Sequence, residues 1–87
     1  MASYELSFKK SVAKDLRSIP KKDVCRILKR IEALREDPRA EGCVKLSALE
    51  RYRVRQGMYR IIYEIHENEL VITIVKVAHR SVVYKNS

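Results

Sequence analysis

The stretch that most constrains the fold is Arg51-Tyr-Arg-Val-Arg-Gln-Gly-Met-Tyr-Arg-Ile-Ile-Tyr63. Side chains of a β-strand alternate between its two faces, so every second residue shares a face. The residues that share one face are Arg51, Arg53 and Arg55. Tyr52 and Val54 then face the other way, and a turn at Gly57 leads to a second strand opening with Tyr59-Arg60. We therefore predict a hairpin that carries several guanidinium groups on one side of a sheet.

A second informative segment is Val77-Ala-His-Arg-Ser-Val-Val-Tyr84, near the end of the chain. It would bring His79, Arg80 and Tyr84 to the same patch. Guanidinium groups stay charged and present paired donors to phosphate oxygens. An imidazole titrates near neutrality and a phenol can donate a proton, so His79 and Tyr84 are candidates for proton transfer. The two segments together indicate a phosphate-binding patch with groups able to move protons.

Ahead of the arginines, the sequence predicts one short strand and two helices. Residues 4–8 alternate as a strand does, and apolar residues then recur at helical spacing. The first helix is marked by Phe8, Val12, Leu16 and Ile19, with Ser7 or Ser11 as its cap. Pro20 separates it from a second helix, which Asp37-Pro38 ends. The apolar stripe of the second helix is Val24, Ile27, Leu28, Ile31 and Leu34.

The second half of the chain predicts a loop and three strands. The loop covers residues 39–47, and the strands cover residues 51–56, 59–66 and about 70–78, with a tight turn at Glu67-Asn68 between the last two. The last strand is apolar on both faces, which is typical of a central strand. We predict an α+β fold in which a helical hairpin packs on one face of a four-stranded antiparallel sheet. The other face is left to the arginines.

Composition favours one globular domain, residues 1–87, with an anionic partner. The chain has 46% hydrophobic and 34% charged residues, and its net charge is +8. Such a charge indicates nucleic acid or an acidic protein as partner. The N-terminal residues resemble no signal peptide, and no apolar run is long enough to cross a membrane. The two cysteines, Cys25 and Cys43, form no disulfide framework or zinc spacing, which favours a reducing cytoplasmic setting.

With these elements in place, the chain resembles the RelE/ParE toxin superfamily of toxin–antitoxin systems. The resemblance rests on the order of elements and on two blocks, Tyr-Arg-Val-Arg…Gly-Met-Tyr-Arg-Ile-Ile-Tyr and Val-Ala-His-Arg-Ser-Val-Val-Tyr. Lys45-Leu-Ser-Ala-Leu, ahead of the arginine strand, fits the same pattern. The similarity covers nearly the whole chain. It implies the RelE-like fold and a small toxin that a RelB-like antitoxin neutralises, as a heterodimer or heterotetramer.

For a RelE-type member, the resemblance implies an endoribonuclease that cleaves messenger RNA in the ribosome without a metal or other cofactor. A 2′-hydroxyl of the RNA attacks the adjacent phosphate. The superfamily pattern points to Arg60, Arg80 and Tyr84 as catalytic, and to Arg53 and Arg55 as basic residues of the strand before. ParE-type members act on DNA gyrase and usually lack this full set, so RelE is favoured. A gyrase inhibitor and an inactive nucleic-acid-binding relative are the alternatives.

The chemistry needs a base, positive charge on the phosphate and an acid for the leaving 5′-oxygen. Arg60 and Arg80 suit the charge, whereas Arg51, Arg53 and Arg55 could hold neighbouring phosphates. Some RelE members have lysines where this chain has Arg53 and Arg55, and arginine does not deprotonate in proteins. The candidates for the base are then His79, Glu50, Glu64 and Glu67, or else water or the ribosome.

The same residues also have structural interpretations. The arginines of residues 51–55 could be a solvated sheet face, and Arg60 could pair with Glu64. His79 could bond backbone at the end of its strand, and Tyr84 could anchor the C-terminus by packing. His66, beside the predicted turn, is expected to be structural.

Overall fold

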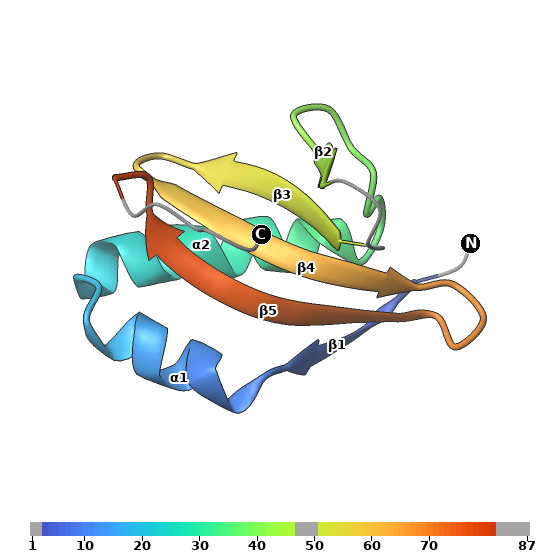
Figure 1. Ribbon diagram of the computed structural model, residues 1–87, viewed down its shortest axis with the longest axis horizontal. Coiled ribbons are helices and arrows are strands. Elements are labelled where there is room, and N and C mark those ends of the chain that lie inside the picture. The colour runs from blue at the N-terminus through green and yellow to red at the C-terminus, as the bar shows by residue number, and fades with distance from the viewer. Residues whose placement is uncertain (1–2, 47–50, 82–87) are drawn as a thin grey trace.

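The computed structural model describes residues 3–46 and 51–81, and they form two helices and a five-stranded sheet (Figure 1). In chain order the elements are β1 (Glu5–Phe8), α1 (Lys10–Arg17), α2 (Lys21–Leu34), β2 (Val44–Leu46), β3 (Arg51–Gln56), β4 (Tyr59–His66) and β5 (Val71–His79). The α+β class and the helical hairpin are as predicted. β3 and β4 have the predicted boundaries, because buried residues recur at every second position and a turn separates the strands. Ile62, on the opposite face of β4, is buried as well.

The sheet has the strand order β1-β5-β4-β3-β2. The prediction of four strands was one short: Val44–Leu46, expected as loop, pairs antiparallel with Arg51–Arg53 as β2. The prediction of an all-antiparallel sheet was also wrong, because β1 runs parallel to β5, with Glu5 opposite Val71. A parallel pairing needs a long crossover, and the two helices provide the start of it.

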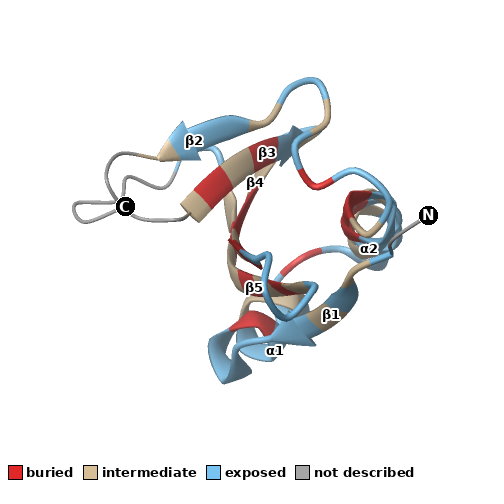
Figure 2. Cartoon of the chain, turned by 90° about the vertical axis from the view of Figure 1, so that its right-hand side faces the viewer, coloured by how far each residue is buried: buried red, intermediate tan, exposed pale blue. Residues whose placement is uncertain are grey.

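The helices cover one face of the sheet, and the core lies between the two layers (Figure 2). From the helices the core takes Val12, Ile19, Ile27, Ile31 and Leu34. From the strands it takes Tyr52, Val54, Ile61, Tyr63, Ile65, Ile72, Ile74 and Val77. The stripe predicted for the second helix is the buried one, apart from Leu28, which is exposed, and Val24, which is partly buried. In the first predicted stripe Val12 and Ile19 are buried and Leu16 is partly buried, but Phe8 ends β1 and is exposed. We call the sheet face away from the helices the open face.

Three local details differ from expectation. Neither Ser7 nor Ser11 caps α1, since Lys9 is its N-cap and no side chain bonds there. The β4–β5 connection is not a tight turn at Glu67-Asn68 but a loop of residues 67–70, because His66 pairs with Val71. Leu70 has a positive φ of 54° in that loop. By contrast, Gln56 pairs with Tyr59, so β3 and β4 are joined by the expected two-residue turn at Gly57, where φ is 61°.

Candidate functional site

Four arginines gather on the open face at the end of the sheet where β3 turns into β4. Arg55 lies directly opposite Arg60, and Arg60 lies opposite Ala78 of β5. Arg53 is two residues back along β3, opposite the buried Ile62. The Arg80 amide donates to the Met58 carbonyl over 2.7 Å, one residue beyond the end of β5. Counted by strand alternation from Ala78, Arg80 then falls on the same face. We call Arg53, Arg55, Arg60 and Arg80 the arginine cluster.

The cluster carries positive charge that nothing in the described residues neutralises. None of its four side chains forms a hydrogen bond or ion pair with any described residue. The Nε atom of Arg60 is buried and has no hydrogen-bond partner. An unmade bond at a buried donor is expensive, and like charges directly opposite in a sheet repel each other. A cluster built in this way favours an anion with several acceptor oxygens, such as phosphate.

Arg51, the first arginine of β3, does not belong to this cluster. Its Nε atom donates to Glu64 Oε2 at 3.0 Å, and the imidazole of His66 lies 3.3 Å from the other oxygen of Glu64. Arg51 is therefore paired at the far end of β3. The alternative pairing of Glu64 with Arg60 is wrong, because Glu64 bonds Arg51 instead. His66 has the structural role that was expected of it.

The structure does not bring His79 to the arginine cluster. His79 lies opposite Tyr59, one residue out of phase with Arg60, and its ring meets the Tyr59 ring edge-on at a centroid distance of 5.5 Å. With Asp15, Ser18 and Ile19 it lines a pocket of about 400 Å³ on the helix side of the sheet. His79 Nδ1 also contacts the Ser81 hydroxyl at 2.8 Å and accepts from the Ser81 amide at 3.1 Å. These contacts agree with a strand-end residue bonded to backbone.

Two other predicted residues lie outside the described part of the chain. Tyr84 falls beyond residue 81, and Glu50 falls in the segment 47–50. Of the remaining carboxylates considered as base, Glu64 is paired with Arg51, and Glu67 forms an ion pair with Arg39 at the opposite end of the sheet. On the described open face, the Glu64 carboxylate and the His66 imidazole lie at the Arg51 end, where Glu64 is paired. The row that holds Arg55 and Arg60 ends at Ala78 and adds no carboxylate or imidazole.

One basic residue near the cluster was not found from the sequence. Arg30 of α2 reaches the β2–β3 edge, where it lines a groove of about 350 Å³ together with Arg53, Arg55, Val44 and Gly42. Its guanidinium also donates to the Glu41 carbonyl at 3.2 Å. No local pattern points to Arg30, because its position depends on where α2 packs against the sheet.

The hydroxyl of Tyr63 joins β4 to the segment between α2 and β2. It donates to the Pro38 carbonyl at 2.6 Å and lies 3.1 Å from Cys43 Sγ. Burial raises the pKa of Tyr63 well above its ordinary value, and the bond to Cys43 adds to the shift. On the same side of the sheet, Arg39 lies over the Tyr52 ring and bonds its hydroxyl. That bond, and the nearby Glu67, raise the pKa of Arg39, so its charge is secure.

Within the described residues, no three side chains of His, Cys, Asp or Glu come together as metal ligands would. No helix of that part of the chain is both long and apolar enough to cross a membrane.

Comparison with known proteins assigns the chain to a family. A family model for the ParE toxin of type II toxin–antitoxin systems matches residues 6–84. A Methanocaldococcus jannaschii protein that bears the toxin name RelE1 is 30% identical over 95% of this chain and 97% of its own length.

Solved structures agree with the sequence comparison. RelE in the archaeal RelE–RelB complex from Pyrococcus horikoshii is 29% identical, with a TM-score of 0.78 over 93% of this chain and 99% of that one. The RelBE2 complex of Mycobacterium tuberculosis contains a chain with a TM-score of 0.80 over 90% of this chain and 99% of that one; at 22% identity it supports the fold alone.

Fold and site together define a small, basic α+β protein whose arginine cluster, on the open face of its sheet, has no partner among residues 3–46 and 51–81. The chain belongs to the RelE/ParE superfamily of toxins of type II toxin–antitoxin systems. The family inferred from the sequence is thereby confirmed.

Proposed function

We propose that the protein is a RelE-type toxin that arrests translation by cleaving messenger RNA on the ribosome. The observation that carries this proposal is the arginine cluster, in which the buried Nε atom of Arg60 has no partner among the described residues. Four guanidiniums on one open face suit a phosphate chain, which offers acceptor oxygens at regular intervals. The relatives compared above at 30% and 29% identity bear RelE names, which favours this branch of the superfamily.

In the proposed reaction, the 2′-hydroxyl of the RNA gives its proton to a base and attacks the adjacent phosphorus. The bond to the 5′-oxygen breaks, and that oxygen takes a proton from an acid. The products are a 2′,3′-cyclic phosphate and a free 5′-hydroxyl. Arg60 and Arg80 would stabilise the charge that builds on the phosphate, and Arg53 and Arg55 would hold the neighbouring phosphates. Arg51, paired with Glu64, would contribute at most to the first contacts.

The proposal leaves four candidates for the groups that transfer protons. Tyr84 stays a candidate for the acid or for stacking on a base. His79 stays a candidate for proton transfer, although it reaches the RNA only if the substrate extends around the end of β5 to the pocket beside Tyr59. The ribosome and water remain the other sources of a base, since arginine does not fill that role.

A RelB-like antitoxin is the proposed partner, in a heterodimer or heterotetramer. RelE from P. horikoshii and from M. jannaschii were both solved as complexes with RelB. An acidic segment that folds onto the open face would pair the arginine cluster and exclude RNA. Exposed Val44, opposite Arg53, and exposed Met58, in the β3–β4 turn, would add apolar contact.

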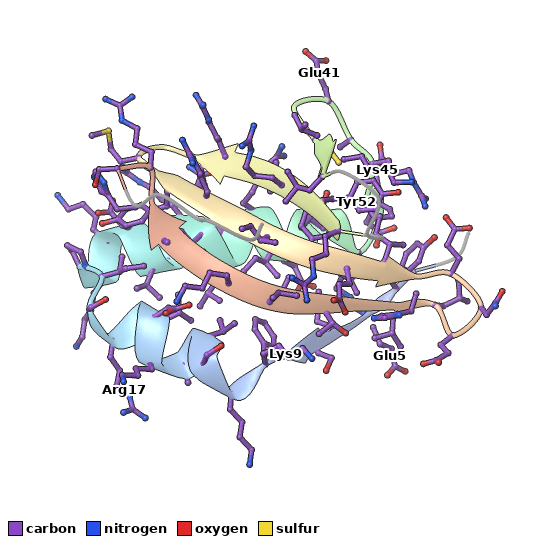
Figure 3. The ribbon with its side chains drawn as sticks, in the orientation of Figure 1. Glu5, Lys9, Arg17, Glu41, Lys45 and Tyr52 are labelled. Carbon is purple, nitrogen blue, oxygen red and sulfur yellow. The ribbon has the colours of Figure 1, made fainter. Side chains whose placement is uncertain are left out.

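The test is to express the protein alone in cells and to map the 5′ ends of messenger RNA. We expect new 5′-hydroxyl ends within translated frames, and none on a transcript whose start codon is destroyed. Arg60→Ala and Arg80→Ala should remove these ends and the growth arrest. The matched control is Arg17→Ala, which removes the same charge from α1, where the side chain projects away from the sheet (Figure 3). Toxicity unchanged in soluble Arg60→Ala and Arg80→Ala would contradict the assignment.

The second candidate is a ParE-like gyrase inhibitor, favoured by the name of the matching family model. It predicts arrest without new messenger ends and loss of DNA supercoiling by gyrase when purified protein is added. Full supercoiling at saturating protein would exclude it.

A further inference from the structure

The strand that carries Arg80 is out of register with its neighbour by one residue. Ile62 of β4 lies opposite Lys76 of β5, but the next residue, Tyr63, lies opposite Ile74. Val75 is therefore an extra residue in β5, accommodated as a β-bulge. Bulges re-aim the side chains that follow them, because an inserted residue reverses which face each later side chain occupies.

The bulge decides which side chain of the strand end joins the arginine cluster. Ahead of it, Ile72 and Ile74 are buried beneath the helices; after it, Val77 is buried, 2% exposed. Without the bulge, the alternation from Ile74 would continue through Lys76 and carry Arg80 to the helix side. With it, Arg80 lies on the open face with Arg60.

The carboxylate of Asp15 in α1 binds β5 immediately after the bulge. One oxygen accepts from Lys76 Nζ at 2.8 Å, and the other accepts from the Val77 amide at 3.2 Å. The Asp15 side chain is only 13% exposed. β1 pairs with β5 only as far as Ile74, so Asp15 satisfies an edge amide that no described strand reaches.

We propose that Asp15 is a positioning residue: it holds β5 in the bulged register that keeps Arg80 within the arginine cluster. Asp15 does not face the open side of the sheet and acts through the backbone of residues 76–80. The bulged register is already favoured because it buries the apolar Val77, whereas the regular register would bury Lys76. The carboxylate adds a charge-assisted bond to the backbone at the residue where that register begins. That Arg80 matters for RNA binding rests on the function proposed above. That Asp15 holds Arg80 in position is independent of that function.

The experiment is a double-mutant cycle between Asp15 and Arg80, measured as the affinity for a short single-stranded RNA at fixed salt. Arg80→Ala should weaken binding about tenfold, as loss of a charge-assisted contact does. Asp15→Ala should weaken it by a similar factor in the natural chain and by less than about twofold in the Arg80→Ala background. Equal losses in both backgrounds would overturn the proposal, because they would mark Asp15 as a merely structural residue.

Amide hydrogen exchange gives a second readout that requires no RNA. Asp15→Ala should speed exchange at Val77 and Arg80 at least about tenfold while leaving β3 protected. Unchanged exchange at Arg80 would also overturn the proposal. If Asp15→Ala fails to fold, Asp15→Asn provides the test, because it keeps an acceptor for the Val77 amide and loses the charge. The matched control is Asp23→Asn, which makes the same charge change in the first turn of α2.

The two proposals can fail separately. Exchange and RNA binding that follow the expected pattern, together with no cleavage of messenger RNA in cells, would sustain the role of Asp15 and remove the ribonuclease. Cleavage that depends on Arg80 but not on Asp15 would support the ribonuclease and remove the positioning role of Asp15.

Discussion

We expect Arg60 to make the fold less stable than an apolar residue of similar length would. Its Nε atom is buried without a partner in the described chain, and Arg55 stands directly opposite. A buried unsatisfied donor costs about 1–3 kcal/mol, and replacing such a group by an apolar one of similar shape can be neutral or stabilising. Strain of this kind is expected at binding sites, where function rather than stability sets the residue.

We therefore expect Arg60→Met to keep or raise the free energy of unfolding, by up to about 1 kcal/mol, while removing RNA binding and toxicity. The measurement is urea unfolding of the purified variant beside the natural chain, with growth after induction as the functional readout. A loss of more than about 1 kcal/mol in Arg60→Met would show that the guanidinium supports the fold.

Tyr63 gives the protein a specific weakness at high pH. Burial and the Cys43 contact raise the pKa of the phenol in the folded chain, while in the unfolded chain it keeps its ordinary value of about 10. Stability from neutral Tyr63 is thus fully present below about pH 10 and is lost as pH rises toward the folded-state pKa. We expect urea midpoints to fall between pH 9 and pH 11 (roughly the window set by that ordinary value). The fall should be smaller in Tyr63→Phe.

Among the elements, the β3–β4 hairpin was the most predictable from sequence. Buried residues recur at every second position of Arg51–Gln56 and Tyr59–His66, with Ile62 as the exception, and Gly57 marks the turn. Both strands therefore begin and end where the pattern predicts. β2 was missed because three residues are too few to show a period. The parallel partner of β1 was missed because local sequence does not encode which distant strand a segment joins.

The candidate site was predictable where it depended on alternation and not where it depended on the bulge. Arg53, Arg55 and Arg60 share a face because their strands are regular up to the turn. The phase of His79 and Arg80 depends on Val75, a residue that reads in sequence as one more apolar position of a strand. Arg51 lies outside the arginine cluster because it pairs with Glu64. That pairing could be predicted only from the register of β3 against β4.

The two-residue turn makes Gly57 important for how the hairpin aligns its arginines. A Cβ at this position would meet no atom within 4 Å, so only the backbone conformation, with φ at 61°, opposes a larger residue. We expect Gly57→Ala to lower the free energy of unfolding by about 1 kcal/mol, the cost of left-handed backbone for an L-residue. Gly57→Asn should lose less, because asparagine tolerates this region. Equal stability of all three chains would contradict a strained turn.

For the whole molecule, a net charge of +8, with four arginines on one face that no described residue pairs, predicts a steep dependence of RNA binding on salt. Each phosphate contact to a single strand contributes about 0.7 to the slope of log affinity against log salt. We expect a slope of about −3 from the arginine cluster, reduced by about 0.7 in Arg80→Ala. Arg51→Ala is the matched control and should change the slope less, because Glu64 already pairs Arg51. The salt slopes of the natural chain and of the two variants are measured by fluorescence anisotropy with a labelled oligonucleotide.

The parallel pairing of β1 with β5 also governs when the chain can become a toxin. Glu5–Phe8 pairs with residues 71–74, so β1 lacks this partner until the residues of β5 have been synthesised. α1 meets the same delay, because it packs against β5 and its Asp15 binds residues 76 and 77. A growing chain that stops short of β5 thus has neither a closed sheet nor a complete arginine cluster. An incomplete chain would therefore not be toxic to the cell that synthesises it.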